Sequence, residues 1–115
     1  MKNLLIGSLM VVALVAFGRP ASAQDKDKGA AVYAASGCSM CHSIAGKGNP
    51  KGPLDDVGSK LSAPEIRGWI TDPAGSAAKA KADRKPPMTA IQAKLKSLSK
   101  DDLDNLVAYL SSLKK

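Results

Sequence analysis

Hydrophobic and polar positions divide the chain into a leading apolar run and several helix-length segments. Residues 4–17 form a run of 14 uncharged residues that follows Lys2 and precedes a small-x-small site at residues 21–23. This order is typical of a cleaved secretory signal peptide. The run is shorter than the roughly 18 to 20 residues that span a membrane as a helix. We therefore expect residues 1–23 to be removed, leaving residues 24–115 as one exported, periplasmic domain without stable membrane insertion.

Helical patterns lie at both ends of this domain. The polar start at residues 24–28 leads into alanine-rich sequence that favours a helix and ends near Gly37. From Ser99, apolar residues recur every three to four positions up to Leu113. Ser99 and Asp102 have the spacing of a capping box, although Asp replaces the longer Glu.

The middle of the chain predicts a helix between two loops. Ser62 and Glu65 form a capping-box start, and the apolar residues of the segment 66–70 then fall on one face. Pro73 ends this helix. Residues 43–60 contain four glycines and two prolines, and residues 74–87 are rich in alanine, lysine and proline. Both segments are predicted as loops.

From Thr89 the helical pattern resumes up to Leu98. The mature chain shows no strand-like alternation and no repeat. We therefore predict an all-α domain of about four helices and two long loops.

The chemistry centres on residues 38–42, Cys-Ser-Met-Cys-His. Two cysteines with two residues between them, followed at once by histidine, form the attachment pattern of a c-type haem. Thioether bonds from Cys38 and Cys41 would fix the backbone beside the porphyrin edge. His42, the only histidine in the protein, could then bind the iron.

Three other interpretations explain this motif less well. A dithiol redox motif is expected in a βαβ context, which the sequence does not predict. A structural zinc needs about four nitrogen or sulfur ligands, and the motif offers three. A disulfide would leave the adjacent His42 unexplained. Haem c, one per chain, is the cofactor that explains all three residues.

Met88 is the candidate for the second iron ligand. Met1 and Met10 leave with the signal peptide, and Met40 lies inside the attachment motif, from which it cannot reach the opposite face of the haem. The proline pair before Met88 stiffens its approach. The alternatives are that Met88 fills a gap in the core, or that the sixth position holds a lysine or stays open.

Two further residues are candidate cofactor contacts. Pro53 follows the motif in a Gly-Pro-Leu segment, and its carbonyl could accept a hydrogen bond from His42, which would orient the ligand. Trp69 could pack against the haem and direct its indole N–H toward a propionate. Each residue also has an ordinary structural interpretation, as a turn former and as a core residue.

Composition and charge narrow the choice of partner. After signal removal only Tyr33, Trp69 and Tyr109 remain as aromatic residues, so a small core would gain much from a haem. We expect the haem-free chain to be largely unfolded.

The mature chain has 15 basic and 10 acidic side chains, a net charge of +5. No nucleic-acid recognition motif accompanies this charge, which favours an acidic redox partner. Lysines 79, 81 and 85, with Arg84, could form the docking rim.

Taken together, these motifs make the chain resemble a small bacterial monohaem cytochrome c with His/Met ligation. The matching pieces, in the family's order, are Gly29 and Tyr33 in the N-terminal helix; Cys38, Cys41 and His42; Gly52-Pro53-Leu54; Trp69 and Pro73; Pro87-Met88; and residues 106–110 in the closing helix. The resemblance implies an all-helical cytochrome c fold wrapped around the haem and one-electron transfer by Fe(III)/Fe(II) cycling.

The first functional hypothesis is therefore a monomeric electron carrier, not an enzyme, that passes electrons between respiratory redox proteins. The second is a haem protein with an open axial site, for gas sensing or peroxidase-like chemistry. A third is a fixed electron-transfer subunit of a larger oxidoreductase. Whether Met88 occupies the iron separates the first hypothesis from the second.

Overall fold

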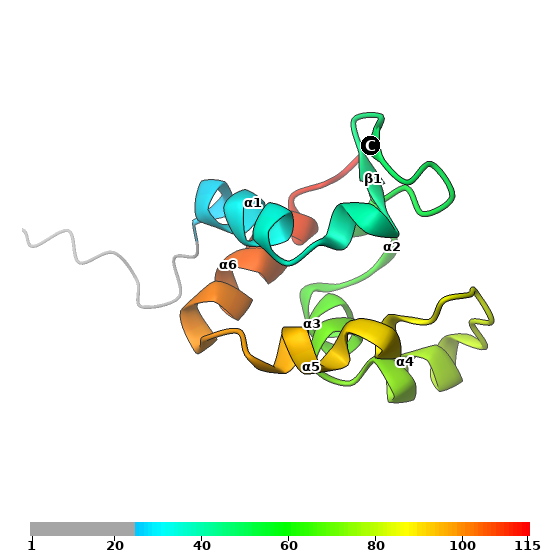
Figure 1. Cartoon of the computed structure of the whole chain (residues 1–115). Coiled ribbons are helices and arrows are strands. Elements are labelled where there is room, and N and C mark those ends of the chain that lie inside the picture. Colours follow the sequence, from blue (N-terminus) through cyan, green and yellow to red (C-terminus); the bar gives the residue numbers. More distant parts are fainter. Residues whose placement is uncertain (1–24) are drawn as a thin grey trace, which may run out of the picture.

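The computed structural model describes residues 25–115, so the predicted signal peptide lies outside the described residues (Figure 1). The elements are α1 (Lys26–Ala35), η1 (Cys38–Met40), β1 (Ser43–Ile44), β2 (Lys47–Gly48), α2 (Val57–Lys60), α3 (Ala63–Thr71), α4 (Pro73–Ala80), η2 (Met88–Ile91), α5 (Gln92–Lys96) and α6 (Lys100–Ser111). The predicted all-α class is confirmed. Within the described range there are six α-helices instead of about four, because the two predicted loops contain α2 and α4.

The first and last helices, α1 and α6, pack directly against each other (Figure 1). Gly29 is buried at this contact, where a Cβ atom would overlap the backbone of Asn105 and lie 2.6 Å from Cβ of Tyr109. Tyr33 and Tyr109 meet edge to face, with ring centroids 6.0 Å apart. Gly29 and Tyr33, which the family resemblance places in the N-terminal helix, thus both lie at the contact of α1 with α6.

Helix α3 packs against the other side of the core. The Ser62 hydroxyl accepts from the Glu65 backbone N–H and the Glu65 carboxylate accepts from the Ser62 N–H, which confirms the predicted capping box. Ile66 and Ile70 are buried, whereas Trp69 is half-buried. The buried hydrophobic core consists of Tyr33, Ile66, Ile70, Leu95, Leu106, Val107 and Leu110.

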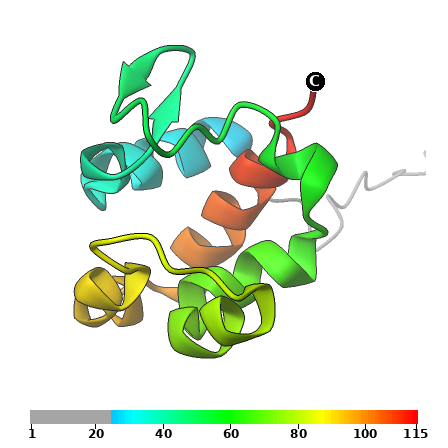
Figure 2. The ribbon, with the colours of Figure 1, turned by 90° about the vertical axis from the view of Figure 1, so that its right-hand side faces the viewer.

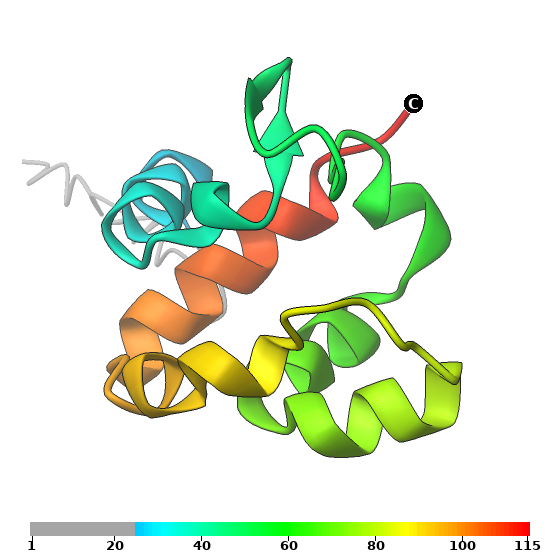
Figure 3. The ribbon, with the colours of Figure 1, turned by 45° about the vertical axis from the view of Figure 1, so that its right-hand side comes forward.

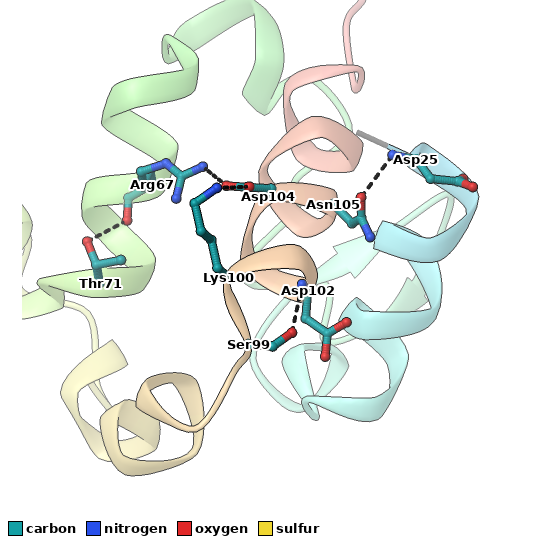
Figure 4. A network of polar contacts seen from close by, with 8 residues as sticks. All are labelled: Asp25, Arg67, Thr71, Ser99, Lys100, Asp102, Asp104 and Asn105. Atoms are coloured by element: carbon teal, nitrogen blue, oxygen red, sulfur yellow. Dashed lines mark hydrogen bonds and ion pairs between the residues drawn. The ribbon is translucent and has the colours of Figure 1, made fainter. Parts of the chain in front are cut away.

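Polar contacts also hold α6 to its neighbours (Figure 4). The Asn105 side-chain carbonyl accepts from the backbone N–H of Asp25, 2.9 Å away. On the α3 side, Asp104 accepts from Arg67 of α3. Asp104 also accepts from Lys100, which belongs to α6 itself, at 3.1 Å. Helix α6 is therefore fixed to the start of α1 and to the middle of α3.

The prediction of a loop over residues 74–87 is wrong for its first half. Asp72 ends α3 and also caps α4, because its carboxylate accepts from the Gly75 N–H at 3.1 Å. Pro73 occupies the first position of α4, where a missing N–H is harmless. The predicted loop 43–60 likewise contains the β1–β2 ribbon and the short α2, whose Gly58 N–H donates to the Leu113 carbonyl at 2.7 Å.

Figures 2 and 3 show α6 running between two groups of elements. On one side lie α1, η1 and the β1–β2 ribbon; on the other lie α3, α4, α5 and the segment 81–88 (Figures 2 and 3). The Cys-x-x-Cys-His motif belongs to the first group and Met88 to the second. None of the helices in residues 25–115 has the length and apolar character needed to cross a membrane.

Candidate functional site

The motif residues lie in a single tight turn directly after α1. Gly37 adopts a left-handed conformation, with φ of 72°, and turns the chain from α1 into η1. The Cys38 carbonyl then accepts from the backbone N–H groups of Cys41 and His42 at 3.1 and 2.9 Å. Both cysteines are half-buried free thiols. The turn therefore presents Cys38, Cys41 and His42 together, as covalent attachment of a haem requires.

The His42 imidazole is fixed by the backbone of the following loop. Its Nδ1 lies 3.0 Å from the carbonyl oxygen of Gly52. A carbonyl can only accept, so Nδ1 carries the proton and donates, and Nε2 keeps a free lone pair. This is the tautomer that a metal-binding histidine needs.

The predicted acceptor, the Pro53 carbonyl, is wrong by one residue. Ser43 pairs with Pro53 in an isolated parallel bridge, with the Ser43 N–H donating to Gly52 at 3.0 Å and the Leu54 N–H donating to Ser43 at 2.8 Å. Successive carbonyls of an extended strand point in opposite directions. In this register the Gly52 carbonyl is therefore the one directed at residues 42 and 43.

Burial is the main cause of the pKa shifts of His42 and Cys38. Burial lowers the pKa of His42; the hydrogen bond to Gly52 raises it, and the Arg84 charge lowers it again. The net direction is downward, which favours the neutral imidazole that binds metals. Burial also raises the pKa of the Cys38 thiol, an effect that the Lys94 charge partly opposes.

The two methionines among residues 25–115 differ in their exposure to solvent. Met40 is 79% exposed, in agreement with its exclusion as an axial ligand. Met88 begins η2 after the extended Pro87 and is half-buried against the hydrophobic core. Trp69 is half-buried on α3, in the same group of elements as Met88.

The apolar residues around the motif suit a haem. Among residues 25–115, twelve partly buried hydrophobic residues pack against the seven buried core residues, and they include Cys38 and Met88. A flat apolar ring is a body that such half-exposed side chains can cover. Two free thiols, a neutral imidazole and a thioether also match the donor set of a c-type haem. Among residues 25–115, no cluster of three or more His, Cys, Asp or Glu side chains is arranged to hold another metal.

One contact at this site was not predicted. Arg84 Nη2 donates to the Cys41 carbonyl at 2.5 Å, across 43 residues of sequence. The sequence suggests Arg84 only as part of a lysine-rich docking rim. In the sequence, Arg84 differs from the neighbouring basic residues only as the single arginine of residues 74–87.

A helical domain that presents a Cys-x-x-Cys-His turn and a half-buried methionine has the arrangement of a c-type haem protein. The family model for cytochrome c matches residues 26–114, and the chain belongs to the cytochrome c family. Proteins of this family transfer electrons through haem c and typically work outside the cytoplasm. Comparison with the curated proteins gives no match, and neither does comparison with the solved structures.

Proposed function

We propose that the protein is a one-electron carrier of the periplasm. One haem c is bound through Cys38 and Cys41, and the iron is held between His42 and Met88. The observation that carries the proposal is the contrast between the two described methionines: Met88 packs against the core, whereas Met40 projects into solvent. With both axial positions filled by protein, the iron has no site for substrate. This favours a carrier over an enzyme or a gas sensor.

Each residue has a definite task in this proposal. Cys38 and Cys41 would anchor the ring, and the Gly52 carbonyl holds the proton on His42 Nδ1, which leaves Nε2 free to bind the iron. The neutral thioether of Met88 is a ligand that raises the reduction potential relative to other ligand sets. When bound, the haem supplies the Fe(III)/Fe(II) couple.

Absorption spectra of the haem-loaded protein test the ligation. We expect a low-spin spectrum with the weak long-wavelength sulfur-to-iron band in wild type. Met88→Ala should lose this band, and Met40→Ala, the matched control for loss of a thioether, should keep it. A high-spin wild-type spectrum that changes with carbon monoxide and not with Met88→Ala would instead support the open-site function.

The partner in this proposal has an acidic docking surface. Lys79, Lys81 and Lys85 are exposed, and among residues 25–115 none of the three takes part in an ion pair. Arg84 donates to the neutral Cys41 carbonyl and so keeps its positive charge, and the proposed rim consists of the three lysines with Arg84. Free surface charges of one sign accelerate the approach of an oppositely charged partner.

Small oxidants of opposite charge test the rim without a known partner. Replacing the three rim lysines by glutamine should slow oxidation by hexacyanoferrate(III), an anion, and not by a cationic cobalt(III) complex. The difference should shrink at high salt. The control replaces Lys26, Lys28 and Lys114, which are exposed and belong to the two ends of the domain. Equal slowing in both triple variants would show that only net charge matters.

A further inference from the structure

We propose that Arg84 is a positioning residue for the distal ligand: its contact with Cys41 holds the segment 81–88, here called the Met88 segment, against the haem-attachment turn. In this arrangement Met88 stays on the iron and exogenous ligands are excluded. The inference rests on the proposed ligation by Met88. It adds the group that keeps that ligand in place.

The contact joins the two groups of elements that face each other across α6. Arg84 belongs to the Met88 segment, and the Cys41 carbonyl that it reaches lies in the attachment turn. The guanidinium also covers Gly52, because a Cβ atom at that position would lie 2.9 Å from Arg84 Cζ. Gly52 in turn holds His42. One side chain therefore connects the segment of the sixth ligand to the backbone that orients the fifth.

Little else in the described structure holds the segment before Met88. Residues 81–87 are all exposed. The Ala82 N–H donates back to α4, and the Pro87 carbonyl accepts from Ala90. Between these points, within residues 25–115, the Arg84–Cys41 bond is the one hydrogen bond made by residues 83–86. A segment with so few buried groups and hydrogen bonds opens easily unless a specific contact closes it.

Arginine suits this role better than the surrounding lysines. Its planar guanidinium holds several donors in a fixed fork, so it loses less conformational freedom for each hydrogen bond than the flexible lysine ammonium does. A bond between a charged donor and a carbonyl is worth about 1.5 kcal/mol or more. Every 1.4 kcal/mol changes an equilibrium constant about tenfold. Removal of the contact should thus raise the population of the open segment about tenfold.

Imidazole binding to the oxidised, haem-loaded protein measures this population, because imidazole displaces Met88 only when the segment opens. We expect Arg84→Gln to bind imidazole about tenfold more tightly than wild type, on the scale of one charged hydrogen bond. Arg84→Lys should fall between the two. The matched control is Lys51→Gln, which removes an exposed cation beside Gly52 and no hydrogen bond of its side chain in the described residues. It should bind imidazole like wild type.

A second measurement separates this inference from the ligation on which it rests. Hydrogen exchange of the hydrogen-bonded backbone amides at the two ends of the segment, Ala82 and Ala90, should become faster in Arg84→Gln and stay unchanged in Lys51→Gln. If Arg84 acts through Met88, adding Arg84→Gln to Met88→Ala should not increase imidazole affinity further.

The outcomes are distinct. Equal imidazole affinity and equal exchange in Arg84→Gln and Lys51→Gln would overturn the role of Arg84 while leaving Met88 as ligand. A wild-type spectrum insensitive to Met88→Ala would refute the ligation. In that case faster exchange in Arg84→Gln would support a contact that closes the segment without positioning a ligand, and the inference as stated would be wrong.

Discussion

The α1–α6 contact and the Met88 segment are held in opposite ways. At the α1–α6 contact, Gly29 lets the helices approach closely, Tyr33 packs against Tyr109, and Asn105 caps the start of α1 with a hydrogen bond. All of these contacts are between protein groups. In the Met88 segment, seven successive residues are exposed, and the one hydrogen bond of residues 83–86 within the described structure is made by Arg84.

This difference indicates which part of the fold the chain completes by itself. A domain of this size buries a modest fraction of its surface, and its described core has seven buried hydrophobic residues. The half-buried side chains include Cys38 in the attachment motif, and Met88 and Ile91 in η2. The helix contact is specified by shape, whereas we expect the other side to depend on the haem.

The largest expected effect comes from withholding the haem. The double variant Cys38→Ala/Cys41→Ala, prepared without haem, should lose cooperative unfolding altogether, because the half-buried side chains would have nothing to cover. Circular dichroism during urea denaturation measures this. Ser39→Ala, inside the same turn but outside the attachment chemistry, should load haem and unfold cooperatively. A native-like cooperative transition in the haem-free chain would show that the helices suffice on their own.

The next effect addresses the helix contact itself. Gly29→Ala places a methyl group against the backbone of α6, and such overpacking typically destabilises by about 1–3 kcal/mol. Gly68→Ala is the control inside α3: its Cβ would lie 3.2 Å from the Ser76 hydroxyl, which can rotate away. Alanine's better helix propensity should make this change neutral or slightly stabilising. Urea denaturation of the haem-loaded proteins compares them, and equal stability would contradict the close approach at Gly29.

The parts of the fold that local sequence determines were predictable. A capping box needs only residues three apart, so Ser62 and Glu65 identified the start of α3. Helical spacing likewise identified the buried face of α6, with Leu106, Val107 and Leu110. The motif at residues 38–42 gave the attachment turn for the same reason: its chemistry depends on neighbours along the chain.

The missed features depend on groups that are distant in sequence or serve twice. Helix α4 was missed because Asp72 both ends one helix and begins the next, and a Pro after Asp suggests only an end. The choice of Gly52 over Pro53 as the partner of His42 follows from the register of the Ser43–Pro53 bridge. The Arg84–Cys41 contact joins residues 43 positions apart, and no local sequence pattern predicts it.

A smaller effect is expected from the hydrogen bond that joins the two ends of the domain. Asn105→Ala leaves the Asp25 N–H without its acceptor, 80 residues away in sequence, and should destabilise by about 1 kcal/mol. The haem spectrum should not change, because the bond lies at the helix contact. Asn49→Ala is the control: that amide donates to the Met40 carbonyl and accepts from the Lys51 N–H, both at exposed positions where water can replace the lost partner, and should change stability by less than about 0.5 kcal/mol. Equal losses would remove the distinction between the two positions.

The smallest expected effect is electrostatic and concerns the contact of α6 with α3. The hydrogen bond from Arg67 and the one from Lys100 hold the pKa of Asp104 below its usual value. A carboxylate with a lowered folded-state pKa stabilises the protein above its unfolded-state pKa, and this stabilisation disappears as the pH falls through the folded-state pKa. The stability difference between wild type and Asp104→Asn should therefore be present at pH 6 and shrink toward pH 3.

The size of this effect is limited by solvent. The Arg67 side chain is 39% exposed and that of Lys100 is 87% exposed, and exposed pairs contribute little. Asp101→Asn is the control, since this exposed carboxylate lies in the first turn of the same helix and takes part in none of the ion pairs among residues 25–115. Thermal unfolding between pH 3 and pH 6 compares the variants. If Asp104→Asn and Asp101→Asn follow the same pH dependence, the ion pairs of Asp104 contribute nothing specific, and apolar packing alone holds α3 against α6.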